Sequence, residues 1–107
     1  MRIGIKYYTL GKDSKNYLIL PKEFEAEGWQ FSQIKREKDV ALYSKTKDKF
    51  KTYELIIVQY YESYQIVDNF VPAKQSWPSD ESFGTLAWAY TTLEDAEKRF
   101  LSLTSKH

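Results

Sequence analysis

The chain has 107 residues, which suffice for one hydrophobic core and are too few for two, and its sixteen basic and fifteen acidic residues leave a formal charge of +1. At that charge the molecule as a whole has no field that attracts nucleic acid or an anionic membrane. Cysteine is absent and the single histidine is His107, so disulfides, thiolate metal sites and the common nucleophile–base pairs of enzymes are excluded.

The first quarter of the chain predicts a β-hairpin followed by a short helix. Apolar side chains alternate over residues 3–9, and a stretch rich in turn formers separates them from the apolar run 17–20. Pro21 then suits the first position of a helix, two glutamates suit its positive end, and Gly28 can close it in the left-handed conformation. We therefore expect a short helix near 21–27.

Residues 29–61 predict a meander of three antiparallel strands, 29–35, 40–45 and 52–61, with charged clusters at the turns. Within the last strand, the run 53–60 is apolar on both of its alternating faces. A strand with two apolar faces needs cover on both sides, which an edge strand does not receive. We expect this strand to be the centre of the sheet, hidden from water on both faces.

A second hairpin is predicted where Asp68 and Asn69 separate two dipeptides rich in β-formers. Both residues tolerate the positive φ that a two-residue hairpin turn requires. The central strand is then expected to extend to Val67 and to pair with residues 70–74. Prolines bracket the segment 72–78, which places it at a sheet edge or in a loop.

The C-terminal helix has the clearest signal in the chain. Thr92 is an N-cap whose side chain can bond the amide of Asp95, and apolar residues follow on one stripe. The preceding strand, 86–90, has a bulky face and a small face, and the small face would let the helix pack closely. We expect a single α+β domain: a mostly antiparallel meander sheet of about five strands with helix 93–103 packed on one face.

The C-terminal third contains two motifs: residues 78–84 have the sequence PSDESFG, and residues 88–96 have the sequence WAYTTLEDA. They resemble a pattern of small uncharacterised phage and bacterial proteins, in which a P-S-x-E-x-[FW]-G turn precedes a W-x-[YF] strand and an L-E-x-A helix. The resemblance spans residues 29–100. It implies a phage or mobile-element origin and a β-meander with a C-terminal helix, and it implies no reaction.

Four aromatic residues are candidates for a contact surface. Tyr60, Tyr61 and Tyr64 follow the predicted central strand, and Trp77 lies in the proline-flanked loop. Exposed tyrosine and tryptophan often carry the binding energy of protein interfaces, and such rings also stack on nucleic-acid bases. Alternatively, the four rings only cap the open end of the core. We predict that they bind a protein partner.

Four lysines suggest an alternative, nucleic-acid binding. Lys45, Lys47, Lys49 and Lys51 recur at every second position, so in an extended ribbon all four would project from one face. A neighbouring ring, either that of Tyr43 or that of Phe50, could then stack on a base. The simpler interpretation is a hairpin whose lysines only keep the surface soluble.

A carboxylate site is the third possibility. Asp80 and Glu81 are adjacent, and with Glu54 or Asp68 they could hold a hard cation or serve a carboxylate-dependent enzyme; charges at a helix start explain the pair equally well. We favour a non-catalytic module that binds a protein partner stoichiometrically, with no cofactor and no metal. Because no apolar run has the length of a membrane span or of a signal-peptide core, we expect it in the cytoplasm.

Overall fold

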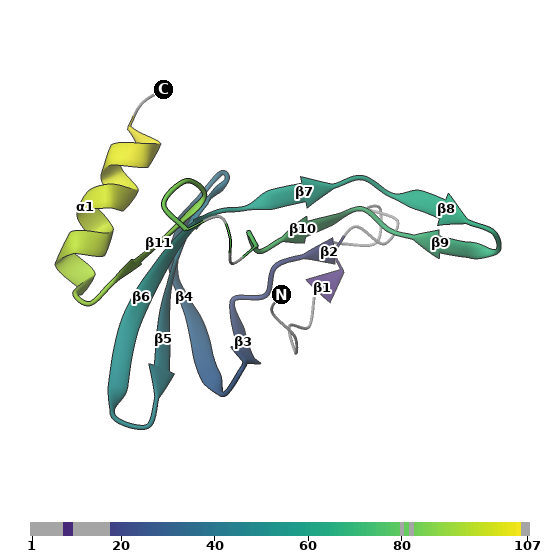
Figure 1. Ribbon diagram of the computed structural model, residues 1–107. Helices are drawn as coiled ribbons and strands as arrows, with labels where there is room; N and C mark the ends of the chain where they lie inside the picture. The colour runs from purple at the N-terminus through teal and green to yellow at the C-terminus, as the bar shows by residue number, and fades with distance from the viewer. Residues whose placement is uncertain (1–7, 10–17, 80, 82, 106–107) are drawn as a thin grey trace.

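Strands make up most of the computed structural model, which describes residues 8–9, 18–79, 81 and 83–105. One antiparallel sheet has the strand order β11-β6-β5-β4-β3, and α1 packs on one of its faces (Figure 1). A second sheet has the order β1-β2-β10-β7, and β8 pairs with β9. The predicted α+β fold is confirmed. The elements are β1 (Tyr8–Thr9), β2 (Leu18–Ile19), β3 (Glu23–Ala26), β4 (Trp29–Glu37), β5 (Val40–Lys47), β6 (Phe50–Ile57), β7 (Gln59–Tyr61), β8 (Tyr64–Ile66), β9 (Asn69–Val71), β10 (Lys74–Ser76), β11 (Ala87–Tyr90) and α1 (Leu93–Thr104).

Strand β6 contributes to the core on both of its faces, as its sequence predicts. Leu55 faces α1 and Ile56 faces the opposite side, and both are fully buried. Burying such a side chain completely contributes about 1.5–3 kcal/mol, so both clusters drive folding. The middle strand, however, is β5, because β11 occupies the edge beyond β6. The helix-side cluster contains Val40, Leu42, Leu55, Ala96 and Phe100; the opposite cluster contains Leu20, Phe24, Ala26, Phe31, Ala41, Tyr43, Ile56, Val58, Trp77 and Ala87.

The predicted helix is present, although it faces the bulky side of the strand before it. The Thr92 hydroxyl accepts a hydrogen bond from the amide of Asp95 at 3.3 Å, which caps the first turn. Trp88 and Tyr90 pack in the helix-side cluster. The expected contact with the small face is therefore wrong. The large rings fill the space beneath the helix, and the Arg99 guanidinium lies 5.3 Å from the Trp88 ring.

The short helix predicted near 21–27 is wrong, because this segment forms strand β3. Phe24 and Ala26 are buried and alternate with exposed glutamates, which is the period of a strand. The Phe24 ring stacks on Phe31 of β4 with centroids 4.7 Å apart. Gly28 does adopt a positive φ, of 84°, but it closes the two-residue hairpin turn between β3 and β4.

The predicted opening hairpin agrees with the structure in its described part. β1 pairs antiparallel with β2, and Tyr8 lies opposite Ile19. The rest of that hairpin, residues 3–7 and 10–17, lies outside the described residues. On its other side β2 pairs parallel with β10, so the N-terminal hairpin is joined to a segment more than fifty residues later.

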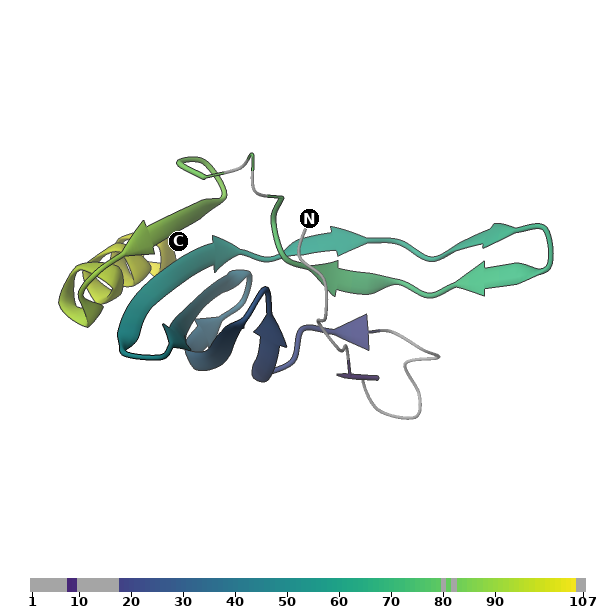
Figure 2. The same cartoon turned by 60° about the horizontal axis from the view of Figure 1, so that its bottom comes forward.

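Residues 59–76 form a two-stranded arm that extends away from the five-stranded sheet and from α1 (Figures 1 and 2). β7 pairs with β10 at its root, and β8 pairs with β9 at its tip. The hairpin was predicted, but its turn lies one residue earlier than expected, because Ile66 pairs with Asn69. Val67 therefore takes the left-handed conformation, with a φ of 54°, which is rare for a β-branched residue.

Candidate functional site

The tip of the arm is the most exposed apolar surface on the described part of the chain. All ten residues 61–70 are exposed. Val67 at the turn has 84% of its surface accessible. In the hairpin register Tyr64 and Ile66 share one face, and Phe70 lies on the other, so both faces are apolar. Tyr61, Tyr64, Ile66, Val67 and Phe70 are the large side chains of this surface, which we call the distal arm.

The distal arm also has an acidic character. Glu62 and Asp68 are the charged residues between positions 59 and 73, which gives this stretch a charge of −2. The left-handed conformation of Val67 adds a further unusual feature. Such a conformation costs on the order of 1 kcal/mol in an ordinary residue, and strained positions cluster at functional sites. Apolar side chains, negative charge and backbone strain thus coincide at one end of the molecule.

A hydrogen-bond network centred on Arg36 fixes the root of the arm to the body. The guanidinium donates from Nε to the carbonyl of Lys38 at 2.8 Å, from Nη1 to Gln75 Oε1 at 2.8 Å and from Nη2 to the Tyr60 hydroxyl at 3.3 Å. The Tyr60 hydroxyl in turn donates to Asp39 Oδ1 at 2.8 Å. Both strands at the root of the arm, β7 and β10, are therefore tied to the turn between β4 and β5.

A β-bulge at Ile34 aims Arg36 at this network. Gln33 lies opposite Tyr43, but after the register shift Lys35 lies opposite Leu42, which faces α1. Arg36 consequently points to the face of the sheet opposite the helix, where unbroken alternation would have pointed it at the helix. The extra residue in β4 thus determines which side of the sheet receives the guanidinium.

Of the four predicted contact residues, three belong to the arm and one does not. Tyr61 and Tyr64 are more than half exposed, and Tyr60 is 48% exposed with its hydroxyl held by Arg36 and Asp39. Trp77 is only 7% exposed. It packs edge-on against Phe24 and Phe31, with centroids 5.5 and 5.4 Å away, so its predicted role as a surface contact is wrong.

Sequence reasoning missed three residues of the distal arm, namely Ile66, Val67 and Phe70. The available signal was the hairpin itself. A two-stranded ribbon has no second layer of its own, so the large side chains on both of its faces stay in water unless another element covers them. A search for exposed tyrosine and tryptophan does not select Ile66, Val67 or Phe70.

The four lysines do not form one basic face. Lys45 and Lys47 share the face of Tyr43, while Lys51 shares the opposite face with Tyr53, because the chain reverses at 48–49. Lys45 Nζ is 2.8 Å from the buried carboxylate of Glu54 and 4.7 Å from the Trp29 ring centroid. The predicted ribbon of aligned lysines is therefore wrong, and one of the four is held inside the structure by an ion pair.

The predicted stacking neighbours of the lysines have opposite environments. Phe50 is 69% exposed, but Tyr43 is fully buried. The Tyr43 hydroxyl donates to the carbonyl of Pro21 at 2.8 Å and accepts from Gln33 Nε2 at 3.0 Å. Burial raises the pKa of Tyr43 above its usual value, while the bond from Gln33 and the charge of Arg36 act in the other direction. Tyr43 is therefore a core residue.

The described carboxylates of the predicted cation site lie in three different parts of the structure. Glu54 is buried against Lys45, Asp68 lies in the turn at the tip of the arm, and Glu81 is exposed on the loop before β11. Asp80 lies outside the described residues, as does His107. Among the residues that the structure describes, no group of three or more His, Cys, Asp or Glu side chains could hold a metal ion.

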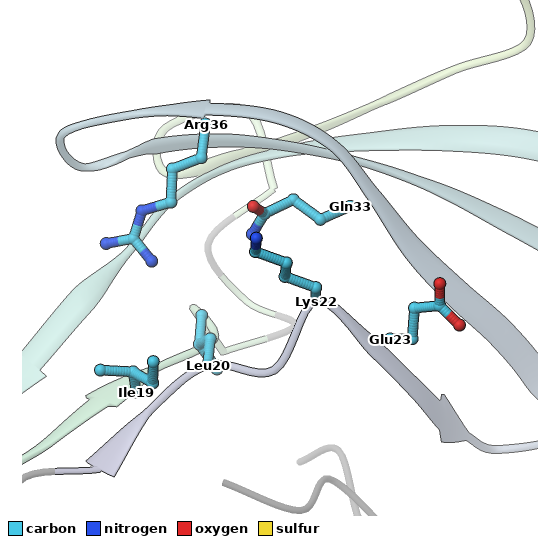
Figure 3. Close-up of a pocket in the computed structure, with 6 residues that line it drawn as sticks. All are labelled: Ile19, Leu20, Lys22, Glu23, Gln33 and Arg36. Carbon is cyan, nitrogen blue, oxygen red and sulfur yellow. The ribbon is translucent and has the colours of Figure 1, made fainter. Parts of the chain in front are cut away.

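A pocket of about 520 Å³ lies beside the root of the arm, on the face opposite α1. Figure 3 shows the Arg36 and Lys22 side chains projecting into this space over the aliphatic side chains of Ile19 and Leu20. The carboxylate of Glu23 points away from them. The described residues that line the pocket are Ile19, Leu20, Lys22, Glu23, Gln33 and Arg36.

No family model matches the chain, and neither a curated protein nor a solved structure shows significant similarity to it. In the described part of the chain, no helix has the length and apolar character needed to cross a membrane.

Proposed function

We propose that the protein is a non-catalytic binding module that acts stoichiometrically on a protein partner, with the distal arm as its contact surface. The observation that carries this proposal is the exposure of five large side chains on a ribbon that projects from the body. These side chains contribute little to the stability of the free protein, because no described element covers them. Their burial in a complex would contribute about 1.5–3 kcal/mol for each fully enclosed aliphatic or aromatic chain.

The root network favours this use of the arm. A two-stranded hairpin is only marginally stable by itself in water. Here its root is held by Arg36, Gln75 and Tyr60 and by pairing with β2, so the base of the ribbon is already ordered before it meets a partner. Ordering in advance lowers the entropic cost of association. A fixed root with an exposed apolar tip is an arrangement suited to insertion into a groove.

The negative charge of the arm favours a partner with a basic binding site. Because the distal arm carries two acidic residues and no basic ones, the complementary site is an apolar groove with lysine or arginine at its rim. The resemblance of the C-terminal third to small phage and bacterial proteins makes a host or defence protein in the cytoplasm the partner that we favour.

The test is a comparison of matched variants in affinity capture from the native host, followed by reconstitution with the purified partner. The double variant Ile66→Thr/Phe70→Ser removes apolar surface from both faces of the distal arm. We expect it to weaken the complex at least about tenfold, as is typical when interface anchors are lost. Leu101→Ser is the control, because Leu101 is more exposed than Ile66 and Phe70 but lies on α1.

A partner that is enriched by the wild type and by Leu101→Ser, and lost with the arm variant, would support the proposal. Equal retention by all three proteins would remove the arm as the contact surface. The melting temperature of each variant should be measured alongside the affinity capture. The arm residues are exposed, so an unchanged melting temperature separates lost contact from lost fold.

A further inference from the structure

The pocket beside the arm root combines an apolar floor with two cationic side chains. Ile19 and Leu20 supply the floor, and Lys22 and Arg36 supply positive charge above it (Figure 3). Its volume of about 520 Å³ falls in the range of small-molecule sites. Neither the root network nor the distal arm requires Lys22, whose side chain is exposed. A lysine that projects over aliphatic side chains beside a fixed guanidinium is an arrangement that recognises an anion with an apolar body.

Arg36 is already positioned for such a ligand. Three of its five N–H groups donate to Lys38, Gln75 and Tyr60, which leaves one N–H on each terminal nitrogen for a further acceptor. Because those bonds hold the side chain, an incoming anion does not have to order it. The β-bulge at Ile34 is what brings the guanidinium to this face.

The local charge selects the kind of anion. Among the described lining residues, Lys22 and Arg36 contribute +2 and Glu23 contributes −1, so the pocket balances a single negative charge. A carboxylate carries one negative charge, whereas a phosphate monoester carries nearly two at neutral pH. The aliphatic floor adds a preference for an apolar group on the same molecule.

We propose that this pocket binds a monocarboxylate attached to an apolar group, with the carboxylate between Lys22 and Arg36 and the apolar group on Ile19 and Leu20. Both a free organic acid and the C-terminal carboxylate of a peptide have this chemistry. The site is separate from the contact surface of the distal arm, and its existence does not depend on the proposed protein partner.

The experiment is a titration of the ¹⁵N-labelled full chain with 4-phenylbutyrate, followed by NMR. We expect saturable shifts at the amides of Lys22 and Gln33 and at Arg36 Nε, with a dissociation constant of about 1 mM. The neutral analogue 4-phenylbutan-1-ol tests the charge, and inorganic phosphate tests the preference for one charge and an apolar body. An acetylated dipeptide ending in leucine, compared with its C-terminal amide, tests the peptide source.

Two variants of the pocket should change the affinity for 4-phenylbutyrate in opposite directions. Lys22→Gln should weaken 4-phenylbutyrate binding about fivefold, and Glu23→Gln should strengthen it about threefold, since each change alters one partly screened charge. Both side chains are exposed, so both variants should keep the wild-type spectrum elsewhere. Lys49→Gln, in the turn between β5 and β6, is the control and should leave the affinity unchanged.

The titrations distinguish a carboxylate site from an apolar contact and from a phosphate site. The absence of saturable shifts would overturn the proposal, as would equal binding of the alcohol, which would reduce the site to an apolar contact. Tighter binding of phosphate would overturn the choice of a monocarboxylate. Binding of the dipeptide acid but not of 4-phenylbutyrate would assign the site to peptide C-termini, and the reverse result would assign it to free organic acids.

Discussion

At the scale of single residues, aromatic side chains that are close in the sequence differ in burial. Trp77 and Tyr61 are both large aromatic residues near the arm, but Trp77 fills the core and Tyr61 stays in water. Nothing in the neighbouring sequence separates them, because burial is decided by which strands approach from elsewhere in the chain. Tertiary packing therefore determines which of the two rings is accessible to a partner.

The buried hydroxyl of Tyr43 should make the stability of the folded protein fall at high pH. Its pKa is raised by burial, so the unfolded state releases this proton at a lower pH than the folded state does. The stability that depends on the neutral hydroxyl is therefore fully present below pH 10.0, the ordinary tyrosine value, and is lost as pH rises through the folded-state pKa. Urea unfolding of the wild type at several pH values should show this loss.

The variant Tyr43→Phe is the matched comparison. It removes the bonds to Pro21 and Gln33, so at pH 8 we expect it to be less stable than the wild type by about 1–3 kcal/mol. Above pH 10 the difference should shrink, because the variant has no hydroxyl to ionise at that position. A difference that stays constant across this range would contradict the assignment.

At the scale of elements, signals contained within one element were predictive and signals shared between elements were not. The Thr92 cap and the stripe from Leu93 to Leu103 define α1 without reference to the rest of the chain. Residues 21–27 satisfied helix rules at both ends, but the alternation of Phe24 and Ala26 against β4 prevailed because it buries both side chains. The hairpin pattern indicates that the arm has no second layer of its own, but whether another element covers the arm depends on the rest of the fold.

Gln75 attaches the arm to the body, so replacing it should lower the free energy of unfolding. Gln75 Oε1 is buried and accepts from both the Leu20 amide and Arg36 Nη1. Gln75→Leu would leave both donors without this acceptor, at a cost of about 1–3 kcal/mol in the free energy of unfolding. Gln75→Glu keeps the acceptor oxygen beside Arg36 and should lose less.

Urea unfolding of both variants measures these costs, and NMR shifts in β7 and β10 report whether the root of the arm has moved. If Gln75→Leu were as stable as the wild type, the network would not be what fixes the arm. If Gln75→Glu lost as much as Gln75→Leu, the acceptor oxygen would not be the decisive group.

At the scale of the whole molecule, the four lysines that suggested nucleic-acid binding do not gather on one described face. The lysines of the β5–β6 hairpin lie on both faces of the sheet, and Lys45 is committed to Glu54. The net charge of +1 adds no attraction at long range. The negative, apolar arm and the more basic hairpin turn lie at different ends of the structure (Figure 1).

This distribution predicts no measurable affinity for single- or double-stranded oligonucleotides, even at a low salt concentration of roughly 50 mM. Fluorescence anisotropy with labelled oligonucleotides at two salt concentrations is the measurement. Binding that weakens steeply with salt, and that is lost in the double variant Lys47→Glu/Lys49→Glu, would instead establish the lysine hairpin as a phosphate-binding surface.

The composition of the arm has a practical consequence for handling the protein. From Thr52 to Ala73 the chain contains neither lysine nor arginine, so within the arm trypsin can cut only after Lys74, at its root. Chymotrypsin, in contrast, meets Tyr61, Tyr64 and Phe70 on an accessible two-stranded projection, the type of site where nicking concentrates. A brief digestion with chymotrypsin should therefore cleave the arm before it cleaves the folded body. A partner bound to the arm should slow that cleavage.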